Sequence, residues 1–257
     1  MHPRTLLLSG ALTLGFASLG SAQTLTFDNA TFANGTYYYT NVYEVGQVAF
    51  NDGALKSGGP DYAINPVGAK KSLLTFADGS QATAYDFCSE LFDGPTGTST
   101  YNLSFGLGNY TASQQSAIGA LFSNALPLFI TQENTIGGAV EIYGAALQMA
   151  LWEIVEDGSP YFTLDELDPQ NALQTLSVNL AATGGSGSDE GQAFLLAESW
   201  LDQISSGSWT DQGGLFYAYA DTNGDQNRLL VSLTPIPEPS VALLGLMGGL
   251  LAFRRRR

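Results

Sequence analysis

Cys88 is the only cysteine in this chain of 257 residues, so it cannot form an intramolecular disulfide. A deprotonated thiol is a strong nucleophile, and a nearby base such as histidine often activates it. The only histidine is His2, in an N-terminal segment that we expect to be removed. A Ser-His-Asp triad, a Cys-His pair and a histidine-ligated zinc site are therefore excluded, and we expect no cofactor and no metal. The alternative is that Cys88 is a small buried hydrophobic residue.

Gln148 is the second residue of chemical interest, and it lies within Leu147-Gln148-Met149-Ala150-Leu151-Trp152. The apolar spacing from Gly138 to Glu156 predicts a helix that is mostly buried. A buried amide without a partner would cost about 1 to 3 kcal/mol, so Gln148 needs one. Hydrogen bonding to the backbone is one answer.

The elements that must position these residues fall into three zones. Residues 24–76 are rich in Tyr, Thr, Val and Phe and are punctuated by Asn-Gly, Asp-Gly and Gly-Gly-Pro, a pattern typical of strands and hairpins. A helical zone follows at about 110–205, and strand patterns return at about 208–234. We therefore expect an α+β domain, a β-sandwich or barrel with an inserted helical subdomain, over residues 23–234.

Four helices are predicted inside the insertion from apolar residues at helical spacing. Ser188 is the predicted N-cap of the last, and its first turn carries acidic residues that the helix dipole favours. The predicted helices are Ala112–Ile130, Gly138–Glu156, about Asp168–Leu180, and Ser188–Ile204.

Phe87-Cys88 and the Gln148 motif together resemble the two motifs of thioester domains in bacterial surface adhesins. In that family an aromatic residue precedes a cysteine, and a later helix carries apolar-Gln-x-x-apolar-Trp. The second motif matches here at every specified position, through Leu147, Leu151 and Trp152. Acidic residues around Cys88 depart from the pattern, and no general base can be assigned.

The resemblance implies that the Cys88 thiolate attacks the Gln148 carboxamide, releases ammonia and forms a thioester between the two side chains. An amine or hydroxyl on a surface or matrix macromolecule would then open the bond. Each molecule would react once, so the expected protein is a single-use adhesin and not an enzyme. Nearby aromatic residues would shield the bond from water, unless they are ordinary core residues: Tyr85, Phe87, Tyr143 and Trp152.

Both ends of the chain predict export. Residues 1–22 have a short basic start, an apolar stretch and small residues before the cleavage point, as in a signal peptide read by signal peptidase. Near the other end, Pro237, Glu238 and Pro239 precede an apolar segment, Val241–Phe253, and four arginines. That segment would form a helix roughly 20 Å long, short of a roughly 30 Å hydrocarbon core. A permanent single-pass anchor is the alternative to transient membrane insertion.

Residues 235–257 resemble the PEP-CTERM sorting signal of Gram-negative bacteria. The resemblance implies recognition and cleavage by an exosortase, transient anchoring in the inner membrane, and delivery to the cell surface or the extracellular polysaccharide matrix.

Charge excludes another class of partner. The chain has a formal net charge of −15 at pH 7, and only Lys56, Lys70, Lys71 and Arg228 are basic outside the two signals. Such a chain repels nucleic acid, so we expect no nucleic-acid partner.

Weaker patterns leave alternatives open. Asp221–Asn227 has oxygen-bearing side chains at alternate positions, but its glycine spacing favours a solvated hairpin loop over a calcium site. Carboxylate pairs suited to a glycosidase, Glu153 with Asp157 and Asp165 with Glu166, are expected by chance in so acidic a chain. The functional alternative to the covalent adhesin is a non-covalent structural or polysaccharide-associated protein of the matrix or biofilm.

Overall fold

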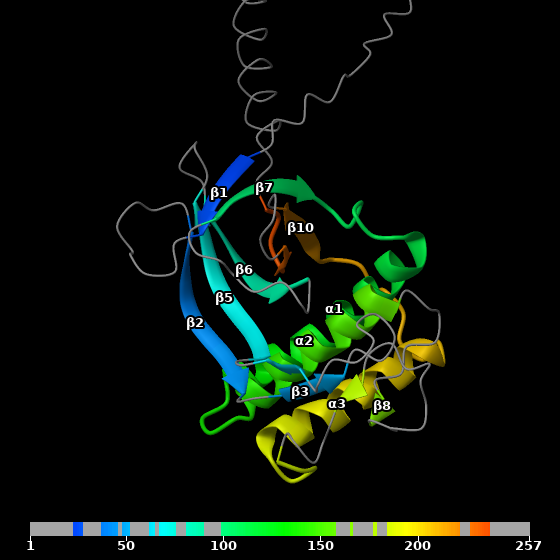
Figure 1. Ribbon diagram of the computed structural model, residues 1–257. Helices are drawn as coiled ribbons and strands as arrows, with labels where there is room; N and C mark the ends of the chain where they lie inside the picture. Colours follow the sequence, from blue (N-terminus) through cyan, green and yellow to red (C-terminus); the bar gives the residue numbers. More distant parts are fainter. Residues whose placement is uncertain are drawn as a thin grey trace, which may run out of the picture. The chain divides into compact units, whose positions relative to one another are not determined.

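The computed structural model describes 11 strands and three helices, all within Ala22–Glu238 (Figure 1). The described residues are 23–27, 37–45, 48–51, 62–64, 67–75, 81–89, 99–157, 165–166, 177–178, 184–221 and 227–236. They form a mixed α+β structure, as the alternation of strand and helix patterns predicts.

The larger sheet has seven strands in the order β1-β7-β10-β11-β6-β5-β2, with every neighbouring pair antiparallel. Its strands are β1 (Gln23–Phe27), β2 (Tyr37–Val45), β5 (Val67–Thr75), β6 (Gln81–Cys88), β7 (Ser99–Phe105), β10 (Phe216–Asp221) and β11 (Arg228–Ser232). A small sheet has the order β4-β3-β9-β8. It consists of β3 (Val48–Asn51), β4 (Tyr62–Ile64), β8 (Asp165–Glu166) and β9 (Ser177–Val178).

Side chains on both faces of the larger sheet are buried. On β6, Tyr85 and Phe87 belong to the main core with the helices, whereas Ala82 and Ala84 belong to a second, smaller core. The second core gathers side chains from five strands and from Ile236, which follows β11: Leu74, Ala82, Ala84, Leu103, Ala218, Ala220, Leu230 and Ile236. The edge strands β1 and β2 also contact each other. The two edges of the larger sheet thus lie near each other, but β1 and β2 are not paired as neighbouring strands in the described residues.

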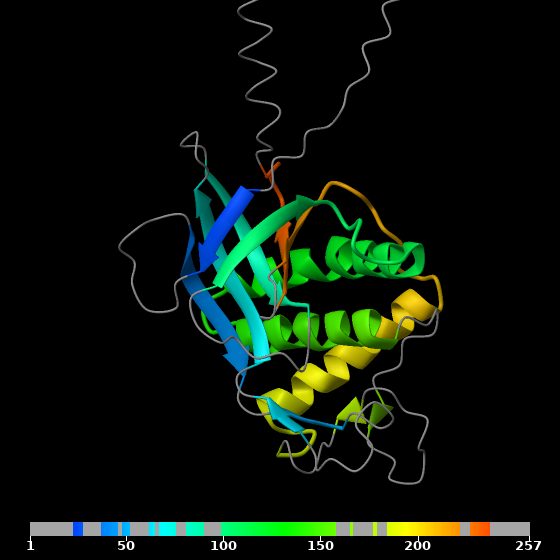
Figure 2. The ribbon, with the colours of Figure 1, turned by 45° about the horizontal axis from the view of Figure 1, so that its top comes forward.

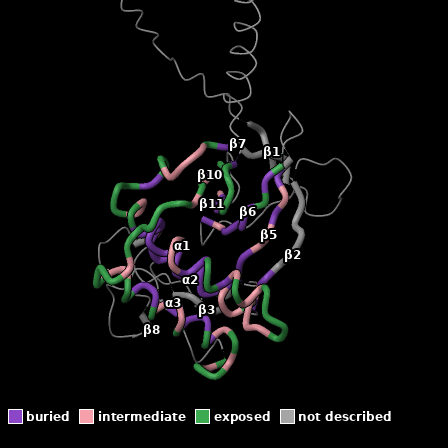
Figure 3. The backbone as a smooth tube through the Cα atoms, turned by 180° about the vertical axis from the view of Figure 1, so that it is seen from behind, coloured by how far each residue is buried: buried purple, intermediate pink, exposed green. Residues whose placement is uncertain are grey.

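Three helices cover the other face of the sheet: α1 (Ala112–Glu133), α2 (Val140–Asp157) and α3 (Asp189–Ser205). Helix α2 packs on β5, β2 and β6 and contacts both α1 and α3, so it is the middle helix (Figure 2). Every residue from Gly144 to Ile154 is buried, which explains its apolar sequence (Figure 3). The prediction of a mostly buried helix around Gln148 is confirmed.

Capping residues define where the first and the last helix begin. Thr111 caps α1 in a reciprocal pair with Gln114, which is a capping box. Ser188 caps α3, since its hydroxyl accepts a hydrogen bond from Gly191 N at 3.0 Å, and Asp189 and Glu190 occupy the first turn. The predicted N-cap is confirmed.

Strands β7 and β10 are neighbours in the sheet, and all three helices, with the short strands β8 and β9, lie between them in the chain. Two predictions need correction. The strand zone was predicted to end near residue 76, but β6 and β7 lie beyond it. The helix predicted at about Asp168–Leu180 is wrong at Ser177–Val178, which pairs with β3 as strand β9. Leu176, Val178 and Leu180 also alternate with a period of two, and a short apolar run does not distinguish the two periods.

The predicted signal peptide (residues 1–22) and the sorting motif (Pro237, Glu238, Pro239), with the apolar segment after it, lie outside the described residues. Within the described part of the chain, no helix is both long and apolar enough to cross a membrane.

Candidate functional site

Cys88 is the last residue of β6, at a point where the strand has lost one of its two neighbours. On one side, the pairing with β11 continues through Arg228, which lies opposite Cys88. On the other side, the pairing with β5 stops at Lys70 and Asp86. Backbone groups alternate in direction along a strand, and Ser89 N–H donates to Asn227 O on the β11 side. The N–H and C=O of Cys88 therefore point to the side that β5 has left.

Two glycines bring strand β5 and helix α2 close to β2 at this point. A Cβ on Gly68 would lie 2.0 Å from the backbone oxygen of Tyr43, so β5 follows β2 there with no room for a side chain. A Cβ on Gly144 would lie 2.7 Å from the same oxygen and 3.3 Å from Ala69 N. Helix α2 thus packs tightly on the strands, and one turn later Gln148 reaches the end of β6.

Gln148 occupies the place that β5 has left. Cys88 N–H donates a hydrogen bond to Gln148 Oε1 at 2.8 Å, and Gln148 Nε2 donates one to Cys88 O at 2.7 Å. The glutamine is only 1% exposed, so the predicted partner of its buried amide is the backbone of Cys88. The structure thereby brings the two residues of the predicted pair into direct contact.

This contact has a chemical consequence for the carboxamide. A donor at Oε1 draws electron density from the carbonyl carbon, and it would stabilise negative charge that develops on the oxygen during attack. The bond from Nε2 to the Cys88 carbonyl fixes the orientation of the amide. The nucleophile and the electrophile therefore belong to two residues held together by two hydrogen bonds.

The surroundings of the thiol act in opposite directions. Burial raises the pKa of the Cys88 thiol and is the largest influence, while the Arg228 guanidinium lowers it and the Asp86 carboxylate raises it. Lys70 and Glu44 make smaller contributions of the same two kinds. The expectation that acidic neighbours raise this pKa holds for Asp86, but burial matters more.

Arg228 and Asp86 form a buried ion pair that the sequence interpretation missed. Nη1 of Arg228 lies 3.2 Å from each carboxylate oxygen of Asp86, and the two side chains are 4% and 0% exposed. The available signal was a lone arginine opening the apolar run Leu229–Leu233. A charged residue at the start of a buried strand requires a partner of opposite charge.

The four predicted aromatic neighbours have different surroundings. Phe87 is fully buried and packs on Phe122 of α1, with ring centroids 4.9 Å apart. Trp152 is 2% exposed and lies about 40° from Gln148 around the helix. Tyr143 lies about 140° from Gln148, and its ring contacts Trp200 of α3.

The fourth aromatic residue, Tyr85, belongs to a polar network at the end of α1. Its hydroxyl donates to Glu133 Oε2 at 2.7 Å, while Tyr43 and Lys71 donate to Oε1 at 2.5 and 2.6 Å. Burial alone raises the pKa of the Glu133 carboxyl, but the hydrogen bonds from Lys71, Tyr43 and Tyr85 outweigh it and lower that pKa. These contacts fasten α1 to three adjacent strands.

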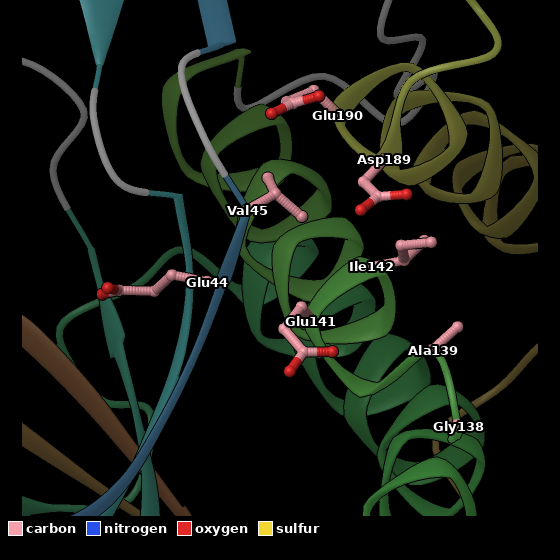
Figure 4. A pocket seen from close by; sticks show the side chains of 8 residues that line it. All are labelled: Glu44, Val45, Gly138, Ala139, Glu141, Ile142, Asp189 and Glu190. Atoms are coloured by element: carbon pink, nitrogen blue, oxygen red, sulfur yellow. The ribbon is translucent and has the colours of Figure 1, made fainter.

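A pocket of about 430 Å³ lies beside the first turns of α2 and α3 (Figure 4). Its lining comprises Glu44, Val45, Gly138, Ala139, Glu141, Ile142, Asp189 and Glu190. Glu44 points away from the helices and pairs with Lys70 at 3.5 Å. The other acids occupy helix first turns, where the dipole stabilises negative charge, so their positions have a structural explanation.

The described residues do not form a site from the other sequence candidates, which are the calcium loop and the carboxylate pairs. Among these residues, no three His, Cys, Asp or Glu side chains are grouped so that they could hold a metal ion. The middle of the Asp221–Asn227 loop lies outside them. Of the carboxylate pairs, Glu153 is buried on α2, and the side chains of Asp157, Asp165 and Glu166 are outside the described part.

Comparison with known proteins yields one structural likeness. No protein-family model matches the chain, and no curated protein matches it. Among solved structures, the chain is similar to the N-terminal thioester domain of a surface protein from Clostridium perfringens. The identity is 14%, the match covers 65% of this chain and 89% of that one, and the TM-score is 0.36. So weak a likeness does not support a functional assignment.

Proposed function

We propose that Cys88 and Gln148 form a thioester that covalently captures an amine or hydroxyl on a surface or matrix macromolecule. The observation that carries the proposal is the pair of hydrogen bonds between the Gln148 carboxamide and the Cys88 backbone. They hold the electrophilic carbon beside the residue that bears the only thiol of the chain. Such positioning replaces a dedicated catalytic group, because reactants held in place gain a large effective concentration.

The first step joins the two side chains. The Cys88 sulfur attacks Gln148 Cδ, the C–N bond breaks, and ammonia leaves with the proton of the thiol. The Cys88 N–H already donates to the oxygen on which negative charge develops. The product is a thioester and one molecule of ammonia.

The second step consumes the thioester. A partner amine attacks the same carbon, the C–S bond breaks, and the sulfur receives the proton that the amine gives up. Gln148 is then joined to the partner through an amide, and Cys88 is again a free thiol. The thioester could re-form only if the sulfur expelled the captured amine from the new amide, so the protein acts once and is not an enzyme.

The cellular setting of this proposal comes from the two ends of the chain. Signal peptidase would remove residues 1–22, and an exosortase would act at Pro237-Glu238-Pro239 after transient insertion of the C-terminal segment in the inner membrane. The thioester-type domain, residues 23–234, would then reside at the surface or in the polysaccharide matrix of a Gram-negative bacterium. Its targets there are macromolecules with exposed amines or hydroxyls.

Intact mass spectrometry of the purified protein tests the proposal. We expect the wild type to be lighter than its calculated mass by one ammonia, and Cys88→Ala to show the full mass. Gln114→Ala is the matched control, because Gln114 also bonds to backbone, through Val155 O at 2.8 Å, but has no thiol beside it. This control should still lose ammonia. Incubation with methylamine should then add one amine to the wild type and none to Cys88→Ala.

A second function stays open on a specific observation. The two hydrogen bonds already satisfy the Gln148 amide, which is what a non-covalent structural or polysaccharide-associated protein requires. Full mass in the wild type, together with rapid modification of native Cys88 by a thiol reagent, would favour this function and refute the thioester.

A further inference from the structure

We infer that Arg228, held in place by Asp86, is a positioning residue that favours the thiolate form of Cys88. This inference rests on the proposed function and adds a control element to the same site. The thiolate is needed twice, first as the nucleophile that forms the thioester and later as the group that the partner's amine displaces.

The register of the sheet places the guanidinium near the sulfur. Arg228 is directly opposite Cys88 in the pairing of β11 with β6, and directly opposite residues share one face of a sheet. Asp86 precedes Cys88 by two residues in β6, so strand alternation places it on that face as well. The thiol, the guanidinium and the carboxylate therefore form a row on two adjacent strands.

Burial makes this row electrostatically effective. Arg228 is 3% exposed and Asp86 is 1% exposed, so water screens their charges less than it would on the surface. The Asp86 carboxylate compensates the buried charge of Arg228, and it also fixes Nη1 between its two oxygens. Removing only one member would leave a buried charge without its partner.

The ionisable groups around the sulfur come from four strands. Arg228 on β11 and Lys70 on β5 favour the thiolate, while Asp86 on β6 and Glu44 on β2 oppose it. Helix α2 contributes the neutral amide of Gln148 at this point. Of these four charges, Arg228 has the largest effect on the pKa of the thiol. Whether the four together lower or raise that pKa therefore depends on Arg228.

The same pair explains how a partly buried thiol can still react. Burial suppresses the thiolate of Cys88, which would slow attack on the carboxamide. A positive charge on the facing strand opposes this suppression and adds no acid or base to the site. The absence of histidine from residues 23–234 is then compatible with cysteine chemistry.

The first experiment measures the thiol where no thioester can form. In full-length protein with Gln148→Met, the thiolate absorbance of Cys88 is followed against pH. We expect the double variant Asp86→Asn with Arg228→Gln to need a higher pH for ionisation, with about tenfold less thiolate at a given pH. Asp86→Asn alone should shift the titration to lower pH. Arg228→Lys, which keeps the charge, should restore values near those of the parent.

Lys70→Gln is the matched control, because Lys70 also lowers the pKa of the thiol but less than Arg228 does. Its shift should be smaller than that of the double variant. The double variant leaves neither charge unpaired, and circular dichroism checks that it folds. If the double variant does not fold, the two single variants still test the inference. A charge effect predicts a lower pH of ionisation in Asp86→Asn and a value near that of the parent in Arg228→Lys, whereas a purely structural role of the pair predicts no such pattern. An unchanged titration in the folded variants overturns the inference.

The second experiment keeps Gln148 and measures the rate of ammonia loss by mass after refolding. Asp86→Asn should accelerate the loss, and the double variant should slow it about tenfold. If the wild type never loses ammonia but the thiol titration responds to Arg228, the proposed function fails while the influence of Arg228 on Cys88 stands. If ammonia is lost at one rate in all folded variants, the thioester stands and the role of Arg228 is refuted.

Discussion

Helices α1 and α2 are attached to the sheet by polar contacts of different kinds. At the end of α1, the charged carboxylate of Glu133 accepts hydrogen bonds from Tyr43, Lys71 and Tyr85, and it lies partly exposed. In the middle of α2, the neutral carboxamide of Gln148 bonds to the backbone of Cys88 and is buried. Both contacts satisfy polar groups, but their chemistry differs.

The difference lies in what each carbonyl carbon can become. A carboxylate stabilised by a lysine and two phenols resists attack, since it already carries negative charge. A neutral amide has a carbon that a thiolate can attack, and its oxygen faces an N–H donor. The Glu133 network is thus suited to stabilising the fold, and the Gln148 contact is suited to positioning an amide carbon for attack by a thiolate.

Glu133→Leu should give the largest loss of stability. Lys71 and both tyrosines would lose their common partner, and we expect the free energy of unfolding to fall by about 2 to 3 kcal/mol. This is less than a fully buried pair would lose, because the Lys71 side chain is 28% exposed. Urea unfolding measures the change.

The matched variant Glu133→Gln keeps one acceptor and should lose less. Ammonia loss at Gln148 should persist in this variant, because the network does not touch the carboxamide. If Glu133→Gln stopped ammonia loss without unfolding the protein, the separation of the two contacts would be wrong.

Gln148→Met should give the second largest loss of stability. The variant is made in a Cys88→Ala background, which removes any cross-link. Methionine fills a similar volume but leaves the N–H and C=O of residue 88 without partners, so we expect a loss of about 2 kcal/mol. Gln114→Met, on the half-exposed start of α1, should lose less than about 1 kcal/mol. Equal losses in the two variants would mean that the buried amide is no more important to the fold than the peripheral one.

Gly144→Ala tests whether close packing of α2 positions Gln148. The new Cβ would meet a backbone oxygen, which cannot move alone, so α2 must shift. Overpacking costs about 1 to 3 kcal/mol, and the better helix propensity of alanine returns up to about 1, so we expect a net loss of about 1 kcal/mol. Ammonia loss should slow at the same time.

Gly119→Ala on α1 is its control. There the Cβ would meet the side chain of Asp211, which lies on an exposed segment and can move aside. Stability should change little and ammonia loss should not change. Slower ammonia loss in Gly119→Ala as well would point to a general effect of helix substitutions.

The sequence predicted the features that a local pattern determines, and it did not predict those that depend on contacts between distant segments. Helical periodicity located α1, α2 and α3, because each buries one or more faces along its whole length. Cys88 was identifiable as the single cysteine, whereas Gln148 was chosen because its motif resembles that of thioester domains, and the burial of Gln148 followed from the helix around it. The contact itself depends on where the pairing of β5 with β6 stops and on the close packing of Gly144 against the backbone of Tyr43.

The ion pair shows the same limit. Asp86 and Arg228 are 142 positions apart, and only the pairing of β11 with β6 brings them together. No local pattern encodes that pairing. The strand β6 itself was missed, because its alternation of polar and apolar residues changes phase between Ala84 and Tyr85.

The smallest expected effect is a loss of stability at alkaline pH. This loss should distinguish the Glu133 network, which contains titrating phenols, from the Gln148 contact, which contains none. Burial and the hydrogen bonds to Glu133 raise the pKa of the Tyr43 and Tyr85 hydroxyls. A group whose pKa is raised on folding contributes stability below its unfolded pKa, which is about 10 for tyrosine, and loses that contribution as pH rises above it. At pH 7 both phenols are neutral in both states, so the stability should not vary with pH through these groups there. In a Cys88→Ala background, which removes the thiol titration, urea midpoints should fall between pH 9 and about 11 more steeply than in the same protein with Tyr43→Phe and Tyr85→Phe. Parallel curves for the two proteins would show that folding does not raise the pKa values of the two phenols. The amide at Gln148 does not titrate, so its contribution to stability should stay constant across the whole range.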